Sequence, residues 1–247
     1  MPEVHPKLKG LLWIFGVLVL TFVLVRGLPI LAKHVPWSIE KKIASVLNLT
    51  ENLSLCDANG SSTELKKLIA RIYPIPGDAN LPIHVNVIAG KTINAFASFG
   101  GEVFVYDGLI QKAESPEELA GVLAHEIGHV HHRHIIEGML SKLTVLALSQ
   151  GSGTSGFNLL ANLKFSREQE AEADRDGLER LQKAHVNVLG TSQFFKREGN
   201  TGAIPSLLSD HPSSEDRAQL AQSYFRMDTT PILTPAEWTK LKGICGK

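Results

Sequence analysis

The sequence is poor in cysteine and has no excess of charge of either sign. Its 247 residues include two cysteines, Cys56 and Cys245, which form no CxxC pair, so a metal site built from cysteines is excluded. The two are either one disulfide of an oxidising compartment or two unrelated thiols. Because 25 Lys and Arg balance 25 Asp and Glu, no basic surface is expected, and nucleic acid is excluded as the main partner.

Long apolar runs are also scarce, and the one that stands out lies near the amino terminus. Leu11–Val25 carries no charge and a single polar residue, Thr21. As a helix it would be about 22 Å long, short of the roughly 30 Å hydrocarbon core, but apolar residues resume at 28–32 beyond Arg26. We therefore expect a transmembrane anchor over residues 11–32 and the lipid bilayer as a partner. A cleaved signal peptide is the alternative.

The charges that flank this segment bear on its orientation. Two lysines precede it, and a larger set of basic residues follows: Arg26, Lys33, Lys41 and Lys42. The positive-inside rule, applied to this count, would place the rest of the chain in the cytosol.

The remaining chain divides by composition and turn signals into a few regions. We expect an N-terminal tail over 1–10, a juxtamembrane connector over 33–62 with an amphipathic helix at 37–49, a main domain over 63–230, and a C-terminal tail over 231–247. Glycine and serine dominate 151–156, which predicts a mobile loop; the sequence does not decide whether it acts as a lid.

The main domain is predicted to be mainly helical with a small sheet. β-branched and aromatic residues predict short strands at 83–88, 92–98 and 102–106, paired as an antiparallel sheet. Capping signals and periodicity predict helices at 64–72, 116–137, 139–149, 166–184 and 214–225. The expected fold class is thus α+β, preceded by one transmembrane helix.

A metal-binding pattern lies within the second of these helices. His125 and His129 are four residues apart, so both project from one helix face and can bind one zinc ion. Glu126, one position further round, is placed beside a zinc-bound water as a general base. This HExxH pattern is typical of metallopeptidase helices and predicts one Zn²⁺ per chain.

A catalytic zinc needs a third protein ligand, and the helix at 166–184 offers several carboxylates. Glu170 and Asp174 share one face, whereas Glu168 and Glu172 lie on roughly the opposite one. Helical geometry alone does not choose between these pairs.

The order of these motifs resembles a known family. HEIGH, then SREQEAEAD about forty residues later, then His211-Pro212, looks like the gluzincin zinc metallopeptidases that include HtpX, BepA and the CAAX prenyl endopeptidase. The resemblance covers roughly residues 60–230, including the 94–97 stretch and the glycine turn at 100–101. Unlike the members with several membrane spans, this chain has one candidate span, before the domain.

The resemblance implies roles for individual residues. Glu170 would be the third zinc ligand, Asp174 would hold a ligand histidine, His211 would stabilise the oxyanion, and Arg217 would support the acidic residues near zinc. The strand containing Asn94, Ala95, Phe96 and Ala97 would bind an extended substrate. No role is expected for His131, His132 and His134, which are assigned to a solvated helix face.

Together these features predict a zinc metalloendopeptidase that acts on unfolded or flexible polypeptides in envelope or membrane protein quality control. The resemblance favours a bacterial inner-membrane protein with an extracytoplasmic catalytic domain, against the count of flanking charges. A zinc-binding chaperone or adaptor with latent protease activity is the first alternative. A structural membrane protein with surface histidines is the second. The sequence does not predict an oligomeric state.

Overall fold

A computed structural model describes residues 10, 12–17, 19, 22, 27, 30–46, 53–58, 60–78, 81–149, 165–201 and 214–246. Within these residues, no helix combines the length and the apolar character needed to cross a bilayer. The predicted glycine- and serine-rich loop at 151–156 and His211 lie outside the described residues.

The sheet has four strands in the order β1-β2-β4-β3, and it is mixed. Its strands are β1 (Leu55–Asp57), β2 (His84–Ile88), β3 (Ala95–Ala97) and β4 (Glu102–Tyr106). β3 and β1 pair antiparallel to their neighbours, but β2 and β4 run parallel. The prediction of three antiparallel strands was therefore wrong in two respects. A fourth strand, β1, lies in the expected connector, and β2 and β4 are parallel neighbours because β3 lies on the far side of β4, at the outer edge.

The turn from β3 to β4 depends on glycine. Gly100 and Gly101 have φ values of 74° and 88°, a region that side chains with a Cβ rarely adopt. A Cβ on Gly101 would lie 1.4 Å from the carbonyl oxygen of Pro82. The missing side chain thus allows the start of β4 to lie against the residues that lead into β2.

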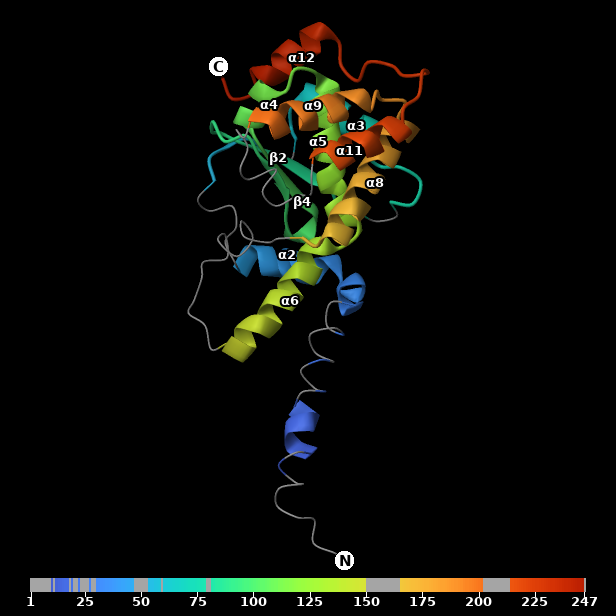
Figure 1. The fold of residues 1–247 in the computed structure, drawn as a ribbon. Helices are drawn as coiled ribbons and strands as arrows, with labels where there is room; N and C mark the ends of the chain where they lie inside the picture. Colours follow the sequence, from blue (N-terminus) through green and yellow to red (C-terminus); the bar gives the residue numbers. More distant parts are fainter. Residues whose placement is uncertain are drawn as a thin grey trace, which may run out of the picture.

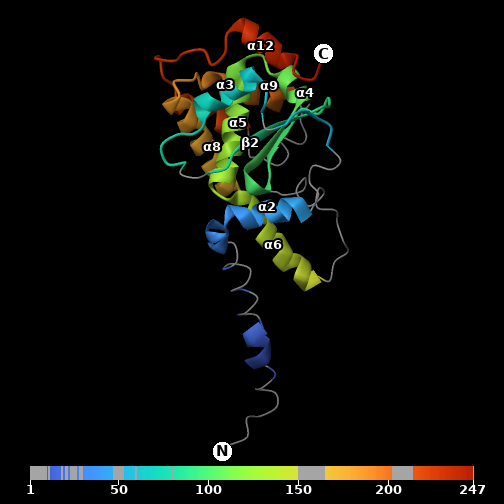
Figure 2. The ribbon, with the colours of Figure 1, turned by 180° about the vertical axis from the view of Figure 1, so that it is seen from behind.

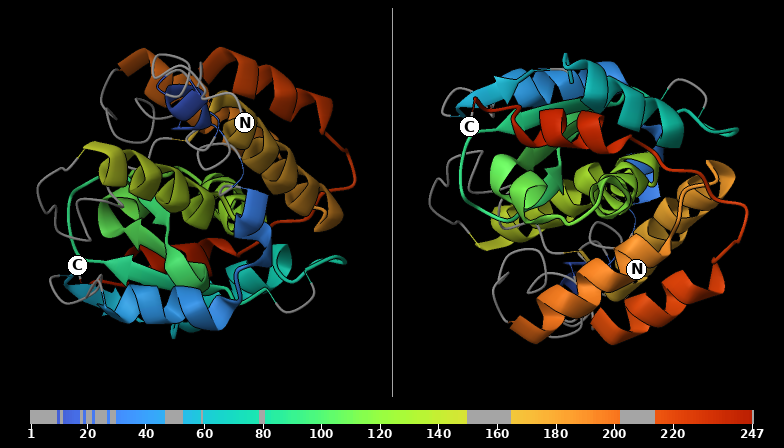
Figure 3. Two further views of the ribbon diagram at one scale, coloured as in Figure 1. Left: turned by 90° about the horizontal axis from the view of Figure 1, so that it is seen from below. Right: turned by 90° about the horizontal axis from the view of Figure 1, so that it is seen from above.

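Helices surround one buried helix, α5 (Pro116–His131), which carries the HEIGH pattern. Ser115 caps it by accepting a hydrogen bond from the N–H of Glu118. The other helices with ten or more residues are α2 (Trp37–Val46), α3 (Thr63–Ile72), α6 (His134–Ser149), α8 (Arg167–Lys183), α9 (Leu189–Thr201) and α11 (Ser214–Ser223). Figures 1 and 3 show α5 between the sheet on one side and α8, α9 and α11 on the other, so its residues 118–130 are buried.

The helix predicted to continue to residue 137 ends at His131. Arg133 has φ 66°, a left-handed conformation that turns the chain into α6. Its guanidinium stacks on Trp37, 3.6 Å from the ring centroid, and pairs with Glu40 at 2.6 Å. The break is thus held by contacts to α2, which sequence periodicity could not reveal.

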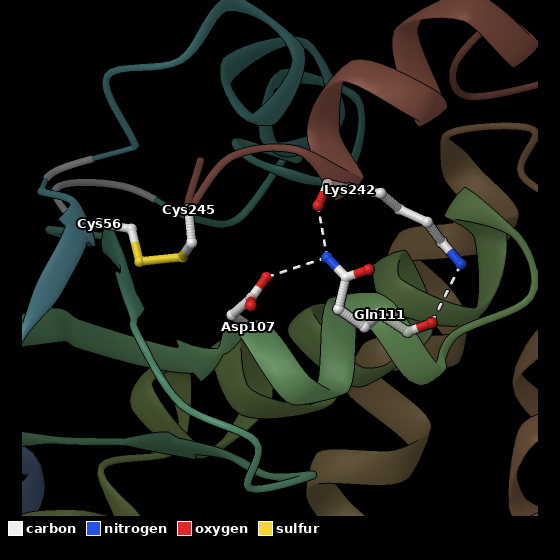
Figure 4. Close-up of a disulfide and its surroundings, with 5 residues drawn as sticks. All are labelled: Cys56, Asp107, Gln111, Lys242 and Cys245. Carbon is white, nitrogen blue, oxygen red and sulfur yellow. Dashed lines mark hydrogen bonds between the residues drawn. A yellow bond between two sulfur atoms is a disulfide. The ribbon is translucent and has the colours of Figure 1, made fainter. Parts of the chain in front are cut away.

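The predicted C-terminal tail is instead part of the folded domain. It forms α12 (Pro235–Lys242), and Ile232, Leu233 and Leu241 are buried. Cys56 and Cys245 form a disulfide that ties this end to β1. Figure 4 shows Gln111 of α4 (Asp107–Lys112) and Lys242 hydrogen-bonded beside it, with the Lys242 ammonium donating to the Gln111 carbonyl at 3.1 Å.

A buried ion network joins α8 to the loop after α3. The Arg180 guanidinium donates to both oxygens of Asp78 at 2.6 and 2.7 Å and also pairs with Asp176. Burial opposes ionisation of Asp176, but hydrogen bonds from His131 and His132, together with Arg180, outweigh it and hold its pKa well below the usual range. These two histidines are therefore half-buried partners of an acid, not residues of a fully solvated face.

The described part of the N-terminal segment leaves the domain at one end. Figures 1 and 2, which view the molecule from opposite sides, both show α2 and α6 at this end and α12 at the other. Residues 12–17 are helical, and their large apolar side chains are exposed.

Candidate metal centre

Two glycines bring α5 and α8 close enough to share one site. A Cβ on Gly128 of α5 would lie 2.8 Å from the Ala173 carbonyl oxygen, and a Cβ on Gly177 of α8 would lie 2.9 Å from the His125 nitrogen. Contacts this short are not tolerated against backbone atoms, so any side chain would push the helices apart. The glycines therefore set the distance across which the site residues face each other.

Three potential ligand atoms converge at this contact. The Nε2 atoms of His125 and His129 lie 3.0 Å apart. One carboxylate oxygen of Glu170 is 3.5 Å from His125 Nε2, and the other is 3.7 Å from His129 Nε2. All three side chains are buried, and their ligand atoms lie within 4.8 Å of one another. The structure thus brings together the three residues that the sequence proposed, and it places Glu170 rather than Glu168 against α5.

Asp174 and Arg217 contact His125 on the Nδ1 side of its ring, away from the other potential ligands. His125 Nδ1 lies 2.8 Å from Asp174 Oδ1, and Arg217 Nε donates to the two Asp174 oxygens at 2.8 and 3.0 Å. Burial would raise the pKa of Asp174, but the charge of Arg217 and the hydrogen bond from His125 hold it well below the usual range. Asp174 is therefore an anion that accepts from Nδ1 and leaves Nε2 directed at the site.

A separate set of side chains contacts the second histidine. His129 Nδ1 lies 3.0 Å from His134 Nδ1, and His134 Nε2 lies 3.1 Å from Glu172 Oε2. Phe165 stacks on the His129 ring with centroids 4.1 Å apart. The expectation of a solvated His134 was wrong, because the chain turns at Arg133 and buries this side chain. Burial lowers the pKa of His134 to about 4, so its ring is neutral near pH 7.

Glu126 lies between the ligand cluster and the edge of the sheet. Its Oε2 accepts a hydrogen bond from the backbone N–H of Ala97 in β3 at 2.8 Å. Burial, followed by the nearby charge of Glu170, raises the pKa of Glu126 to about 8. A bound cation would reduce the electrostatic repulsion between these two buried acidic groups.

The chemistry of the donor set fits zinc. Two imidazole nitrogens and one carboxylate oxygen are the ligand types of catalytic zinc sites, which leave a further position for water or substrate. Burial and the charge of Glu170 raise the pKa of Glu126, and a dication at the cluster would offset this repulsion between the two acids. Magnesium and calcium prefer all-oxygen sites, so the two nitrogens argue against them.

Helix-borne His-Glu-x-x-His ligands completed by a glutamate from a second helix define a zinc metallopeptidase of the gluzincin type. Comparison with known sequences gives the family, because the model of peptidase family M48 matches residues 61–224, more than half of the chain. The chain therefore belongs to peptidase family M48. This agrees with the family resemblance that the order of the sequence motifs predicted.

Named relatives differ in how much of their length the chain covers. Mitochondrial metalloendopeptidase OMA1 of Schizosaccharomyces pombe is 28% identical over 89% of this chain and 74% of its own length. Metalloprotease LoiP of Escherichia coli is 32% identical over 56% of this chain and 61% of its own. The beta-barrel assembly-enhancing protease of the same species is 27% identical over 62% of this chain, which spans only 36% of that relative.

Proposed function

We propose that the chain is a membrane-anchored zinc endopeptidase that cleaves unfolded or flexible polypeptides. One observation carries the proposal: Glu126 lies beside the cluster of His125, His129 and Glu170 and also reaches the outer edge of β3 through Ala97. A proton acceptor, a metal site and a strand edge for the substrate therefore meet at one place.

In this proposal His125, His129 and Glu170 hold one zinc ion. When bound, zinc supplies a Lewis acid that polarises the peptide carbonyl and makes the attacking water more acidic. Asp174 fixes the tautomer of His125 by accepting from Nδ1, and Arg217 keeps Asp174 ionised and oriented.

Glu126 moves the proton. Its carboxylate accepts a proton from the attacking water and delivers it to the nitrogen of the leaving amine, which completes hydrolysis of the peptide bond. The burial that raises its pKa makes it a stronger base than an exposed carboxylate. His211, by the spacing of the His-Pro motif, would donate a hydrogen bond to the oxyanion, an interaction worth about 3–4 kcal/mol in such sites.

The edge strand would bind the substrate. β3 pairs with β4 through Asn94, Phe96 and Ser98, so the backbone groups of Ala95 and Ala97 point away from β4. An extended peptide could add there as a further strand through main-chain hydrogen bonds to Ala95 and to the Ala97 carbonyl, because the Ala97 N–H donates to Glu126. Such hydrogen bonds depend little on sequence. This mode favours unfolded segments over compact domains.

Casein digestion by the purified full chain tests the activity. We expect the zinc-loaded protein to cleave casein, and Glu126→Gln to bind zinc normally but lose about 10²- to 10⁴-fold in rate. Glu179→Gln, an exposed carboxylate paired with Lys183, is the matched control and should keep the full rate. Zinc-loaded wild type that protects casein from aggregation without cleaving it would support the chaperone alternative instead.

A membrane location would explain the exposed apolar side chains of Leu12, Trp13, Ile14 and Phe15, which are 57–75% exposed. The Cys56–Cys245 disulfide favours an oxidising compartment, in keeping with an extracytoplasmic catalytic domain on the bacterial inner membrane and a role in envelope quality control. Protease added outside sealed inverted vesicles should then leave the domain intact. Digestion of the domain in intact inverted vesicles would reject this orientation.

A further inference from the structure

His134 occupies a position that the proposed mechanism does not use. It is the first residue of α6, directly after the left-handed turn at Arg133, and it is 1% exposed. Its two ring nitrogens have different partners: Nδ1 lies 3.0 Å from His129 Nδ1, and Nε2 lies 3.1 Å from a carboxylate oxygen of Glu172. The His134 ring therefore connects His129 to an acid on α8.

The arrangement of protons follows from the metal. This step rests on the proposed function, in which His129 binds zinc through Nε2, the nitrogen that faces His125 Nε2 and Glu170. A ligating imidazole uses the lone pair of Nε2 and keeps its hydrogen on Nδ1. That hydrogen points at His134 Nδ1, which must accept it. His134 consequently carries its own hydrogen on Nε2 and donates it to Glu172.

We propose that His134 and Glu172 are a positioning pair for the zinc ligand His129. A chain of two hydrogen bonds, each with one donor and one acceptor, holds His129 in the tautomer that binds zinc through Nε2. Phe165 restrains the same ring from its face, so the ring is fixed both at its edge and on its face. Second partners of this kind tune metal affinity as well as ligand orientation.

The two ligand histidines are thus held in different ways. Asp174 contacts His125 directly and is a buried anion that depends on Arg217. Glu172 does not contact His129 directly but through His134, and the Glu172 side chain is 45% exposed. Placing the charge near solvent avoids the desolvation cost of a second buried carboxylate. We therefore expect loss of His134 to weaken zinc binding more than neutralisation of Glu172.

The test is zinc affinity, measured on the purified full chain by competition with a chromophoric chelator. His134→Ala should lose about 10- to 100-fold in affinity. His134→Asn keeps an oxygen acceptor at the Nδ1 position but does not reach Glu172, so it should recover part of this loss. Glu172→Gln should weaken binding by a smaller factor, and Glu168→Gln, an exposed acid one turn earlier on α8, should bind as wild type.

Visible absorption of the cobalt-substituted protein provides a second readout, because it reports ligand geometry rather than turnover. His134→Ala should shift the cobalt bands, and Glu168→Gln should not. If folded His134→Ala binds zinc as tightly as wild type, the proposal is wrong. Should that variant fail to fold, Glu172→Gln decides, since this partly exposed residue can be changed without opening a cavity; zinc affinity equal to that of Glu168→Gln would overturn the proposal.

Failure of the proposed function would look different. If His129 is not a zinc ligand, His129→Ala would retain stoichiometric zinc, and the wild type would show the same cobalt spectrum as that variant. If the metal site is correct but His134 does not position it, His129→Ala would lose zinc while His134→Ala would not.

Discussion

Gly177→Ala should damage the metal centre although the atoms nearest to a Cβ at this position belong to the backbone of α5. Its Cβ would lie 2.9 Å from the His125 nitrogen and 3.1 Å from the carbonyl carbon of Ala124, both backbone atoms that cannot rotate away. Ordinary contact begins near 3.4 Å, so α5 and α8 must separate by about 0.5 Å (3.4 minus 2.9). Zinc–ligand distances tolerate only about 0.2 Å. We therefore expect zinc affinity to fall along with stability.

The sign of the change in unfolding free energy distinguishes overpacking at Gly177 from the usual effect of replacing a helical glycine by alanine. In an open helix, Gly→Ala stabilises by about 1 kcal/mol, whereas overpacking costs about 1–3 kcal/mol. Glu179→Ala, at an exposed position of the same helix, is the control and should leave both quantities close to those of wild type. Thermal unfolding with and without zinc, together with chelator competition, measures both effects. A Gly177→Ala protein with an increased Tm and unchanged zinc affinity would refute the reasoning about helix separation.

Three further predictions concern parts of the fold away from the metal. Replacing Cys56 and Cys245 by serine should lower the free energy of unfolding by about 2–5 kcal/mol, measured by urea denaturation. Arg180→Met should cost about 3–5 kcal/mol in the same assay, because it leaves Asp78 and Asp176 buried without their guanidinium; no loss would contradict the ion network. Because the folded-state pKa of Asp176 is depressed, its stabilising contribution is present above the unfolded value near 3.9 and is lost as pH falls below it. Urea unfolding at pH 6 and pH 3 should therefore differ more in wild type than in Asp176→Asn.

Local periodicity was sufficient to find the parts of the site that lie on regular helices. His125 and His129 follow from i, i+4 spacing, and the same rule grouped Glu170 with Asp174. The choice of Glu170 over Glu168 needed the family resemblance, because it depends on which face of α8 packs against α5. The peptidase family predicted in this way is confirmed by the match to family M48.

The parts that were missed depend on contacts distant in sequence. β1 has three residues and pairs with a strand about thirty positions later, so no local pattern marks it. His134 was assigned to the wrong surroundings because a continuous helix to 137 would direct it elsewhere. The turn at Arg133 is stabilised by Trp37 and Glu40, almost a hundred residues earlier. Sequence spacing within one helix carries no information about such partners.

The disulfide between Cys56 and Cys245 also changes what a cut in the chain does. The two cysteines are 189 positions apart, and the residues between them include every described residue of the metal centre. A single break anywhere in that closed loop, including one made by another copy of the enzyme, leaves one covalent molecule. Its mass on a denaturing gel without reductant would differ from the intact chain only by one water. Cleaved and intact molecules would separate only after reduction, so the integrity of a purified sample must be judged on a reducing gel.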